Sequence, residues 1–598
     1  MHILLWLTVS VLVLTAGYAV FVAVTLGLHQ RLPLAFRGIS IEAIPDRAAR
    51  YYGKRILFTS DKPCAWEIPF LRERYPDAKS WSAVRIQQTA GILATMLRER
   101  LGMQSRDRAA ILKQNHIDIH IFAAGVVRGG GIACPINGKF PTADLRLYLE
   151  KIGATILISD TLTIGRVGRE CGVFSGIKTI VLAEKRQTEA GPRDIEAFLQ
   201  ATNPQIQVRW LEELLADVYE VSAAVPRAKD DIIYLVHSSG TTGFPKAVVL
   251  KNGRQSHAVR GWLCYVHISR HRDKGYLAVP NNHQAILLTF NGLLLVGAAV
   301  HWTGGYDHDD FAPETTIKEL ADGRFTGFFG FPVTFTQLKE VALENYDLSR
   351  IRFWVSTADA SHEVIQRRFV AFGGAFRRAG WPRAGSIYMD AQGSSEVGTP
   401  SVLRYITPST KTFGRRIGRP GSTPFGPKTR VVTDTGEMAA RGQAGRLEVK
   451  GKTVFDGYWK DDALTKSVIR KNWFFTGDIV RHGTDGHIVQ LDREVDVIHT
   501  ADGPVYTLPM EEKIHRHPAV FDACVYGARH HDGTQRPATA IALRQGFTVS
   551  RDELKCELNA MLDQEEQLER VDVIGWDEFP IGVTGKTLKR VFRERTEP

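Results

Sequence analysis

A run of small, hydroxyl-bearing residues that ends in a lysine is the clearest chemical feature of the sequence. The apolar segment 230–236 leads into HSSGTTGFPK, residues 237–246. Small side chains let backbone N–H groups close on phosphate oxygens, hydroxyls add donors and Lys246 adds positive charge. The pattern differs from the Walker loop, because Lys246 is followed by Ala247 rather than by Ser or Thr. We therefore predict a phosphate-binding loop of another kind, with an ordinary Ser/Thr/Gly loop as the alternative.

The loop is the first of an ordered series of motifs. SSGTTGFPKAVVL, from residue 238, resembles the nucleotide signature of the adenylate-forming enzymes, which include acyl-CoA synthetases, luciferases and peptide-synthetase adenylation domains. The other segments of that superfamily's pattern follow in order: DAQGSSE (390–396), GRPG (418–421), GYW (457–459), NWFFTGD (472–478), LDREVD (491–496) and PIGVTGK (580–586). The resemblance covers about residues 80 to 595. It implies that ATP activates a carboxylate as an acyl-adenylate with release of pyrophosphate, and that a thiol then accepts the acyl group.

The resemblance also implies roles for individual residues. Those that would bind the nucleotide are Ser238, Ser239, Gly240, Thr241, Thr242, Gly243, Lys246, Gln392, Gly393, Ser395, Asp478 and Arg493. Those that would act in catalysis are Lys586, Glu396, Thr241 and His283. Glu396 and Thr241 would hold Mg²⁺, and a carboxylate suits a hard cation that bridges ATP oxygens. Asp478 would accept both ribose hydroxyls, and Lys586 would stabilise charge between the carboxylate and the α-phosphate.

Two parts of the pattern depart from the superfamily. STADAS, residues 356–361, replaces a glycine-rich segment beside adenine, and Gln392 stands where an aromatic ring often stacks. ADGPVYTLP, residues 501–509, replaces the loop that shapes the coenzyme A tunnel after the C-terminal domain swivels about residues 492–496. Gly503 remains available to bind coenzyme A in that second arrangement. ATP use is therefore better supported than transfer to coenzyme A.

The segment after the phosphate loop resembles the acyl-binding region. His283 matches a histidine that often gates the carboxylate end of the substrate, with a buried core histidine as the alternative. FFGFP, residues 328–332, would wall the acyl site, and we expect other apolar residues around it: Phe325, Phe335, Leu293, Leu294, Leu295 and Trp302. These walls offer no charge for the α-ammonium group of an amino acid, so the expected substrate is a fatty or otherwise lipid-soluble acid.

The N-terminus carries a separate signal. Residues 3–28 contain no charged side chain, and at 1.5 Å per residue they span about 39 Å, more than the ~30 Å hydrocarbon core of a bilayer. A cleaved signal peptide fits poorly because no Lys or Arg precedes the run, and a buried core helix seldom stays uncharged for so long. Positive residues follow the run, at Arg31 and Arg37, which predicts a single-pass anchor with the catalytic domains in the cytoplasm.

The elements that must position the motifs follow from periodicity. Residues 81–101 have helical spacing, whereas 108–115, 154–160 and 230–236 read as buried strands, which indicates a parallel α/β layout. From residue 429 the sequence pattern predicts mainly β-strands separated by glycine turns. We predict an α/β fold in which a large N-terminal domain of α/β subdomains carries a β-rich subdomain and a small mobile α+β domain follows. The predicted divisions are a transmembrane anchor (1–30), an AMP-binding domain (31–492) and a C-terminal domain (493–598).

Composition sets broad limits on function. The 598 residues are 44% hydrophobic and 24% charged, which is ordinary for a globular protein. The six cysteines show no metal-binding spacing, and the net charge of +11 favours anionic partners such as nucleotides, coenzymes or a lipid surface.

The leading hypothesis is a membrane-anchored ligase that makes long-chain acyl-CoA, with fatty acid, ATP, Mg²⁺, coenzyme A and membrane lipid as partners and no nucleic acid. This anchored architecture resembles that of long-chain and very-long-chain acyl-CoA synthetases and fatty-acid transport proteins. The alternatives are an acyl-AMP ligase that serves a carrier protein or forms a lactone, a fatty-acid uptake protein, and an inactive binding module.

Overall fold

The computed structural model describes residues 31, 33–34, 38–168, 174–184, 192–238, 246–265, 273–306, 309–359, 361–375, 384–582 and 585–595. The predicted membrane segment, residues 3–28, lies outside this part of the chain, and so do residues 239–245 of the phosphate loop. Within the described ranges, no helix has the length and apolar character needed to cross a membrane.

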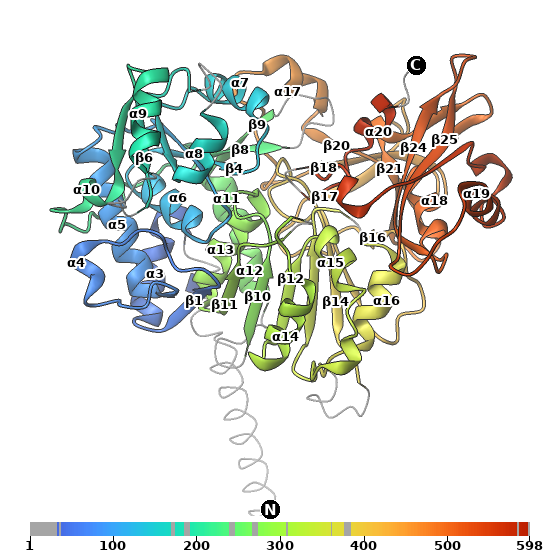
Figure 1. Cartoon of the computed structure of the whole chain (residues 1–598), viewed down its shortest axis with the longest axis horizontal. Helices are drawn as coiled ribbons and strands as arrows, with labels where there is room; N and C mark the ends of the chain where they lie inside the picture. Colours follow the sequence, from blue (N-terminus) through green and yellow to red (C-terminus); the bar gives the residue numbers. More distant parts are fainter. Residues whose placement is uncertain are drawn as a thin grey trace, which may run out of the picture.

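A seven-stranded, mostly parallel sheet comes from the first part of the chain (Figure 1). In spatial order its strands are β7 (Gln207–Trp210), β6 (Thr179–Leu182), β5 (Ile156–Ser159), β3 (Arg108–Lys113), β4 (Ile132–Asn137), β8 (Ile232–Ser238) and β9 (Lys246–Lys251), of which only β9 is antiparallel to its neighbour. The helices of this region are α5 (Ala83–Glu99), α6 (Asp118–Arg128), α7 (Thr142–Ile152), α8 (Thr161–Val167), α9 (Pro192–Thr202) and α10 (Leu211–Leu215). The continuous apolar runs of β3 and β5 are typical of strands covered on both faces.

The predicted elements of this region are present with small shifts at their ends. The strands predicted at 108–115, 154–160 and 230–236 are β3, β5 and β8. The helix predicted at 81–101 is α5, which begins after Ser82, whose side chain accepts a hydrogen bond from the Arg85 N–H at 3.1 Å. This N-cap ends the short strand β2 (Ser80–Ser82) and starts the helix.

An eight-stranded sheet forms the second α/β layer. Its order is β15 (Val402–Ile406), β14 (Ile387–Gln392), β13 (Phe353–Thr357), β12 (Gly327–Gly330), β10 (Lys274–Ala278), β11 (Ala299–Thr303), β1 (Ile56–Ser60) and β2. All pairs are parallel except those at the two edges. Its helices are α3 (Ile44–Tyr52), α4 (Pro69–Arg72), α11 (Asn252–Val259), α12 (Gly261–Cys264), α13 (Gln284–Val296), α14 (Pro313–Asp322), α15 (Pro332–Leu338) and α16 (Glu363–Ala371).

A six-stranded antiparallel sheet follows, as the β-rich texture after residue 429 predicts. It contains β16 (Arg416–Gly418), β21 (Ile488–Arg493), β20 (Trp473–His482), β18 (Ala444–Lys450) and β17 (Lys428–Val432), with β19 (Ile469–Arg470) paired to β20 and with helix α17 (Asp462–Val468) before β19. The predicted division between domains falls directly at the end of β21.

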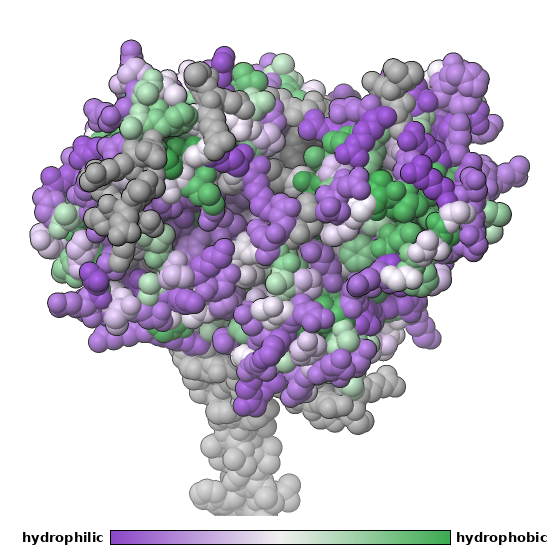
Figure 2. All heavy atoms as spheres, in the orientation of Figure 1, coloured by the Kyte–Doolittle hydropathy of each residue, from purple (hydrophilic) through white to green (hydrophobic). Residues whose placement is uncertain are grey.

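The last part of the chain has its own core and packs against the larger part (red in Figure 1). It contains the hairpin β22 (Ile498–Thr500) and β23 (Gly503–Val505), the sheet β24 (Val520–Arg529), β25 (Gln535–Leu543) and β26 (Arg570–Val573), and the helices α18 (Thr507–Ile514), α19 (Arg551–Asn559) and α20 (Lys589–Arg595). The face shown in Figure 2 is mostly hydrophilic, and hydrophobic residues gather on it in the region of α18. This smaller unit is the predicted α+β domain.

Candidate active site

The predicted site residues follow the carboxyl ends of strands in both large sheets. β8 ends at Ser238, β13 at Thr357 and β14 at Gln392, and His283 lies in the loop after β10. Ligands of open α/β sheets bind outside these strand ends. The fold therefore brings motifs that are far apart in the sequence to one location in space.

A polar cavity of about 360 Å³ lies at this location. It brings together eight of the predicted residues: Ser238, Lys246, His283, Gly393, Ser395, Glu396, Arg493 and Lys586. The C-terminal domain supplies Lys586, and Arg493 stands at the end of β21 where the two parts meet, so the cavity spans both parts of the molecule. The predicted phosphate-loop residues Ser239, Gly240, Thr241, Thr242 and Gly243 lie outside the described residues, and their roles stay predictions.

The lining of this cavity is rich in positive charge, as a triphosphate would require. Its cationic side chains are Lys246, Arg446, Arg470, Arg493 and Lys586, and its acidic ones are Glu396 and Glu494. Loss of solvation and the nearby Arg493 guanidinium lower the pKa of Lys586. A bound anion would therefore be stabilised by several cations, and it would also reduce the repulsion between them.

Glu396 is held in place by two neighbours. The Tyr458 hydroxyl donates a hydrogen bond to Glu396 Oε1 at 3.0 Å, and the Phe455 N–H donates to the Glu396 carbonyl at 2.7 Å. Burial and the Glu396 carboxylate raise the pKa of Tyr458 far above its ordinary value, so the hydroxyl keeps its proton. Lys246 Nζ lies 5.5 Å from the centre of the Tyr458 ring. The carboxylate that would bind Mg²⁺ is thus oriented by a phenol that also faces the phosphate-loop lysine.

His283 begins helix α13 and lines the cavity. Its Nδ1 accepts a hydrogen bond from the Ala285 N–H at 3.2 Å, and its ring meets Phe331 edge-on at 5.4 Å between centroids. Burial, together with the charge of Lys586, lowers the pKa of His283 to about 3. The imidazole is therefore neutral at physiological pH and presents its Nε2 side as a hydrogen-bonding group.

Asp478 and Arg493 are direct cross-strand partners on β20 and β21. Arg493 Nη1 lies 3.3 Å from Asp478 Oδ1, and this carboxylate raises the pKa of Arg493. Asp478 also accepts hydrogen bonds from Thr476 Oγ1 at 2.8 Å and Gln490 Nε2 at 3.3 Å. Arg493 lines the cavity, whereas Asp478 lies buried directly behind it.

The departures from the superfamily pattern have structural consequences. Gln392 is buried, and its Oε1 has no hydrogen-bond partner among the described residues. Ala358 adopts φ +81°, a left-handed conformation that favours glycine, and it stands in the segment where the superfamily has glycine. Gly503 lies in the β22–β23 hairpin with φ +129° and with open space around it. It does not line the polar cavity in this arrangement of the domains.

A second cavity, of about 200 Å³, adjoins the first and is lined mainly by apolar side chains. Leu293, Phe328 and Phe329 line it as predicted. Other residues of this group do not line the cavity as predicted, and they pack within the hydrophobic cores without reaching it: Phe325, Phe335, Leu294, Leu295, Trp302 and Phe331. Residues that the sequence did not single out complete the walls, among them Trp262, Tyr265, Phe353 and Met389.

Sequence reasoning also missed groups in the polar cavity. Tyr458 lies in the GYW motif, yet nothing in that motif shows that its hydroxyl reaches Glu396, 62 positions away. Arg446 and Arg470 belong to the antiparallel sheet, and no motif marks them. The basic character of β18 and β19 was the available signal, but solvated surface arginines look the same in a sequence.

Comparison with known proteins places the chain in a family. The sequence model of the AMP-binding enzyme family matches residues 54–459, and that of the AMP-binding enzyme C-terminal domain matches residues 509–586. The chain therefore belongs to the AMP-binding enzyme family. This confirms the predicted family, whose adenylate-forming enzymes use ATP, Mg²⁺ and coenzyme A as the prediction states.

Individual relatives agree with this assignment and differ in what their names say they act on. The chain is 30% identical to 3-aminoavenalumate diazotase of a Streptomyces species, over 83% of this chain and 85% of that protein. It is 25% identical to the long-chain-fatty-acid–CoA ligase of Haemophilus influenzae, over 85% and 89%. ATP-bound MatB of Rhodopseudomonas palustris has the same fold, with a TM-score of 0.73 at 20% identity over 93% of this chain and 99% of that one.

Proposed function

We propose that this protein converts a hydrophobic carboxylic acid, in particular a long-chain fatty acid, to its acyl-AMP and then to its coenzyme A thioester. The observation that carries the proposal is the junction of the two cavities. His283, Ala358, Gly393 and Ser394 line both the polar and the apolar cavity. An acid whose tail fills the apolar cavity would present its carboxylate at this junction, beside the cations that suit ATP.

The residues at the junction fit the first half-reaction. Lys586, when protonated, would stabilise the charge that develops where the carboxylate meets the α-phosphate. The neutral His283 would orient the carboxylate without titrating above its pKa of about 3. Glu396, oriented by Tyr458, would hold Mg²⁺, which when bound neutralises phosphate charge.

The apolar cavity supports a lipid-like acid. The acidic residue in its lining, Asp273, is paired with Arg352 at 2.7 Å, so it offers no unpaired charge to an ammonium group. Each Å² of apolar ligand surface that the aromatic and aliphatic walls remove from water contributes about 25 cal/mol to the free energy of binding. The similarity to a long-chain-fatty-acid–CoA ligase supports the same class of acid.

A panel of acids tests this proposal. Short, long and very long fatty acids and aryl acids would each be incubated with ATP and Mg²⁺, with and without coenzyme A, while pyrophosphate, acyl-AMP and acyl-CoA are measured. We expect the highest kcat/KM for a long-chain acid and acyl-CoA only when coenzyme A is present. Accumulation of acyl-AMP with coenzyme A present would favour a carrier-protein acceptor or a lactone product. Absence of pyrophosphate with every acid would favour an uptake protein or an inactive binding module.

We further propose that residues 3–28 anchor the protein once in a membrane, with the catalytic domains in the cytoplasm. The uncharged length of the segment and the arginines that follow it support this proposal. Deleting residues 1–30 should release the protein from sedimented membranes and leave activity toward a detergent-dispersed acid. A truncated protein that still sediments with membranes would show that another surface holds it there.

A further inference from the structure

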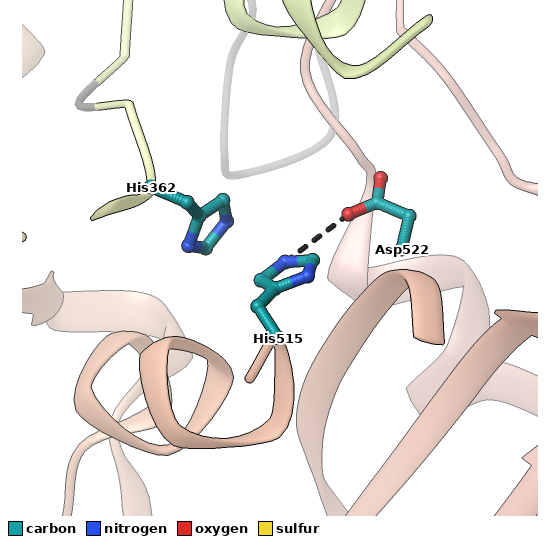
Figure 3. A group of neighbouring side chains, drawn as sticks. All are labelled: His362, His515 and Asp522. Atoms are coloured by element: carbon teal, nitrogen blue, oxygen red, sulfur yellow. Dashed lines mark ion pairs between the residues drawn. The ribbon is translucent and has the colours of Figure 1, made fainter. Parts of the chain in front are cut away.

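A buried polar cluster lies where the C-terminal domain packs on helix α16. Its members do not line the polar or the apolar cavity. Figure 3 shows three of its members, His362 at the start of α16, His515 at the end of α18 and Asp522 on β24. His515 Nε2 lies 3.2 Å from Asp522 Oδ1, and the rings of His362 and His515 meet edge-on with centroids 4.0 Å apart. The cluster therefore joins the two domains.

The spacing of these three side chains would suit a divalent cation, but their other neighbours oppose one. His362 Nδ1 lies 2.7 Å from Glu512 Oε1, and His362 Nε2 lies 2.9 Å from Arg415 Nη2. Both ring nitrogens thus have partners, and a guanidinium stands where a metal would approach. Burial and this guanidinium lower the pKa of His362 well below its ordinary value. His362 is therefore a neutral hydrogen-bonding residue of a domain contact.

Glu512, on α18 of the C-terminal domain, is at the centre of this contact. Its Oε2 accepts a hydrogen bond from the Glu363 N–H at 3.1 Å, at the N-terminus of α16. Its Oε1 pairs with His362 and lies 3.4 Å from Arg415 Nε. Removal from water raises the pKa of Glu512, and Arg415 and the Glu363 N–H oppose that rise. A carboxylate so far removed from water depends on these partners from the other domain.

The same helix is connected to Lys586. Glu511 precedes Glu512 on α18, and its Oε1 lies 2.7 Å from Lys589 Nζ. Lys589 begins α20 and is three positions from Lys586, which lines the polar cavity. Arg415 Nη2 also lies 3.5 Å from Glu511 Oε2. Contacts that fix α18 against α16 therefore also fix the segment that carries Lys586.

We infer that Glu512 is a positioning residue. It docks the C-terminal domain on α16 and so holds Lys586 in the polar cavity. This inference rests on the proposed function, because it assigns Glu512 to the adenylate-forming step. It follows that loss of Glu512 impairs that step and not the transfer of the acyl group to a thiol, since Glu512 touches no cavity residue assigned to either substrate.

Two variants and a matched control test the inference. Glu512→Ala removes the contact, and Glu512→Gln keeps its shape but not its charge. Arg516→Ala breaks an exposed ion pair between the same two domains, Arg516 Nη2 to Glu363 Oε2 at 3.2 Å. Acid-dependent pyrophosphate release and the conversion of supplied acyl-AMP to acyl-CoA would be measured separately, with thermal midpoints to verify folding. A dye pair, one on each domain, would report docking directly.

We expect Glu512→Ala to slow pyrophosphate release about 10-fold to 100-fold, with a smaller loss for Glu512→Gln and none for Arg516→Ala. Acyl-CoA formation from supplied acyl-AMP should stay at the parent rate or rise, and the docked fraction should fall. Equal losses in both half-reactions, or an unchanged docked fraction, would overturn the inference. If the parent releases no pyrophosphate with any acid, the proposed function fails, and the dye measurement on Glu512→Ala still decides whether Glu512 docks the domain.

Discussion

At the residue scale, the Tyr458 hydroxyl gives the proposed metal ligand Glu396 a fixed orientation through a single hydrogen bond of 3.0 Å. The phenol occupies Glu396 Oε1, so we expect the other carboxylate oxygen, Oε2, to bind the cation. Lys246 Nζ lies 5.5 Å from the centre of the Tyr458 ring, so this ring also borders the phosphate loop. Residues from three motifs thus meet at the Tyr458 side chain.

We predict that Tyr458→Phe raises the Mg²⁺ concentration needed for half-maximal pyrophosphate release. The hydrogen bond to a charged group contributes about 1.5–3 kcal/mol, so the shift should be about ten-fold or more. Saturating Mg²⁺ should restore most of the rate. Glu396→Ala and Lys246→Ala should lose the activity without such rescue. An unchanged Mg²⁺ dependence in Tyr458→Phe would show that the hydroxyl does not orient Glu396.

At the scale of elements, the turn after β13 carries strain. Ala358 has φ +81° and lines both cavities. The left-handed conformation costs a non-glycine residue about 1–2 kcal/mol, and glycine loses part of that gain through its greater freedom in the unfolded chain. We predict that Ala358→Gly raises the free energy of unfolding by about 0.5–1 kcal/mol, measured by denaturant titration.

Ala391→Gly provides the control for this prediction. Ala391 is a buried residue of β14 with ordinary strand geometry, so glycine there should destabilise by about 1 kcal/mol. If both substitutions destabilise to the same degree, the strain at Ala358 has no energetic weight.

A buried carboxyl in the adjacent strand β14 makes stability depend on pH. Asp390 is buried, its Oδ1 has no hydrogen-bond partner among the described residues, and burial raises its pKa from 3.8 to about 7. Because the folded state holds this proton more tightly than the unfolded state, its contribution to stability is full below pH 3.8 and is lost as pH rises through 7.

Asp390→Asn should remove that contribution to the pH dependence. We predict that the free energy of unfolding of the variant, relative to that of the parent, rises by about 2 kcal/mol or more between pH 5 and pH 8. A tenfold difference in proton affinity between the folded and unfolded states corresponds to about 1.4 kcal/mol. Thermal midpoints at several pH values would measure it. Parallel curves for parent and variant would mean that another group carries the dependence.

The motif residues were predictable because glycine, hydroxyl and charged types recur in a fixed order, and the strands before them are continuous apolar runs. The division between core and cavity was not predictable: Phe325 and Phe335 pack in the core while Phe329 lines the cavity, and all three look alike in a sequence. Phe329 lies on β12, whereas Phe325 precedes that strand and Phe335 lies on α15, so the difference comes from how these elements pack together and not from residue type.

At the scale of the whole molecule, two domains share one site. The C-terminal domain supplies Lys586 to a cavity built by the large domain, and Glu512 binds that domain to α16. These contacts join residues about 150 positions apart, and no local pattern predicts them. The hinge predicted at residues 492–496 begins where Arg493 ends β21 opposite Asp478, and a swivel of the C-terminal domain about it stays a prediction.

The most direct measurement of the central claim follows the two half-reactions in Lys586→Ala. Lys586 lines the polar cavity in this arrangement of the domains, and Gly503 does not. We predict that the variant loses roughly 10²–10³-fold in acid-dependent pyrophosphate release, as expected when one group that stabilises developing charge is removed. Conversion of supplied acyl-AMP to acyl-CoA should continue at the parent rate. Pyrophosphate release at the parent rate in Lys586→Ala would contradict the account, because adenylate formation would then not occur at the cavity described above.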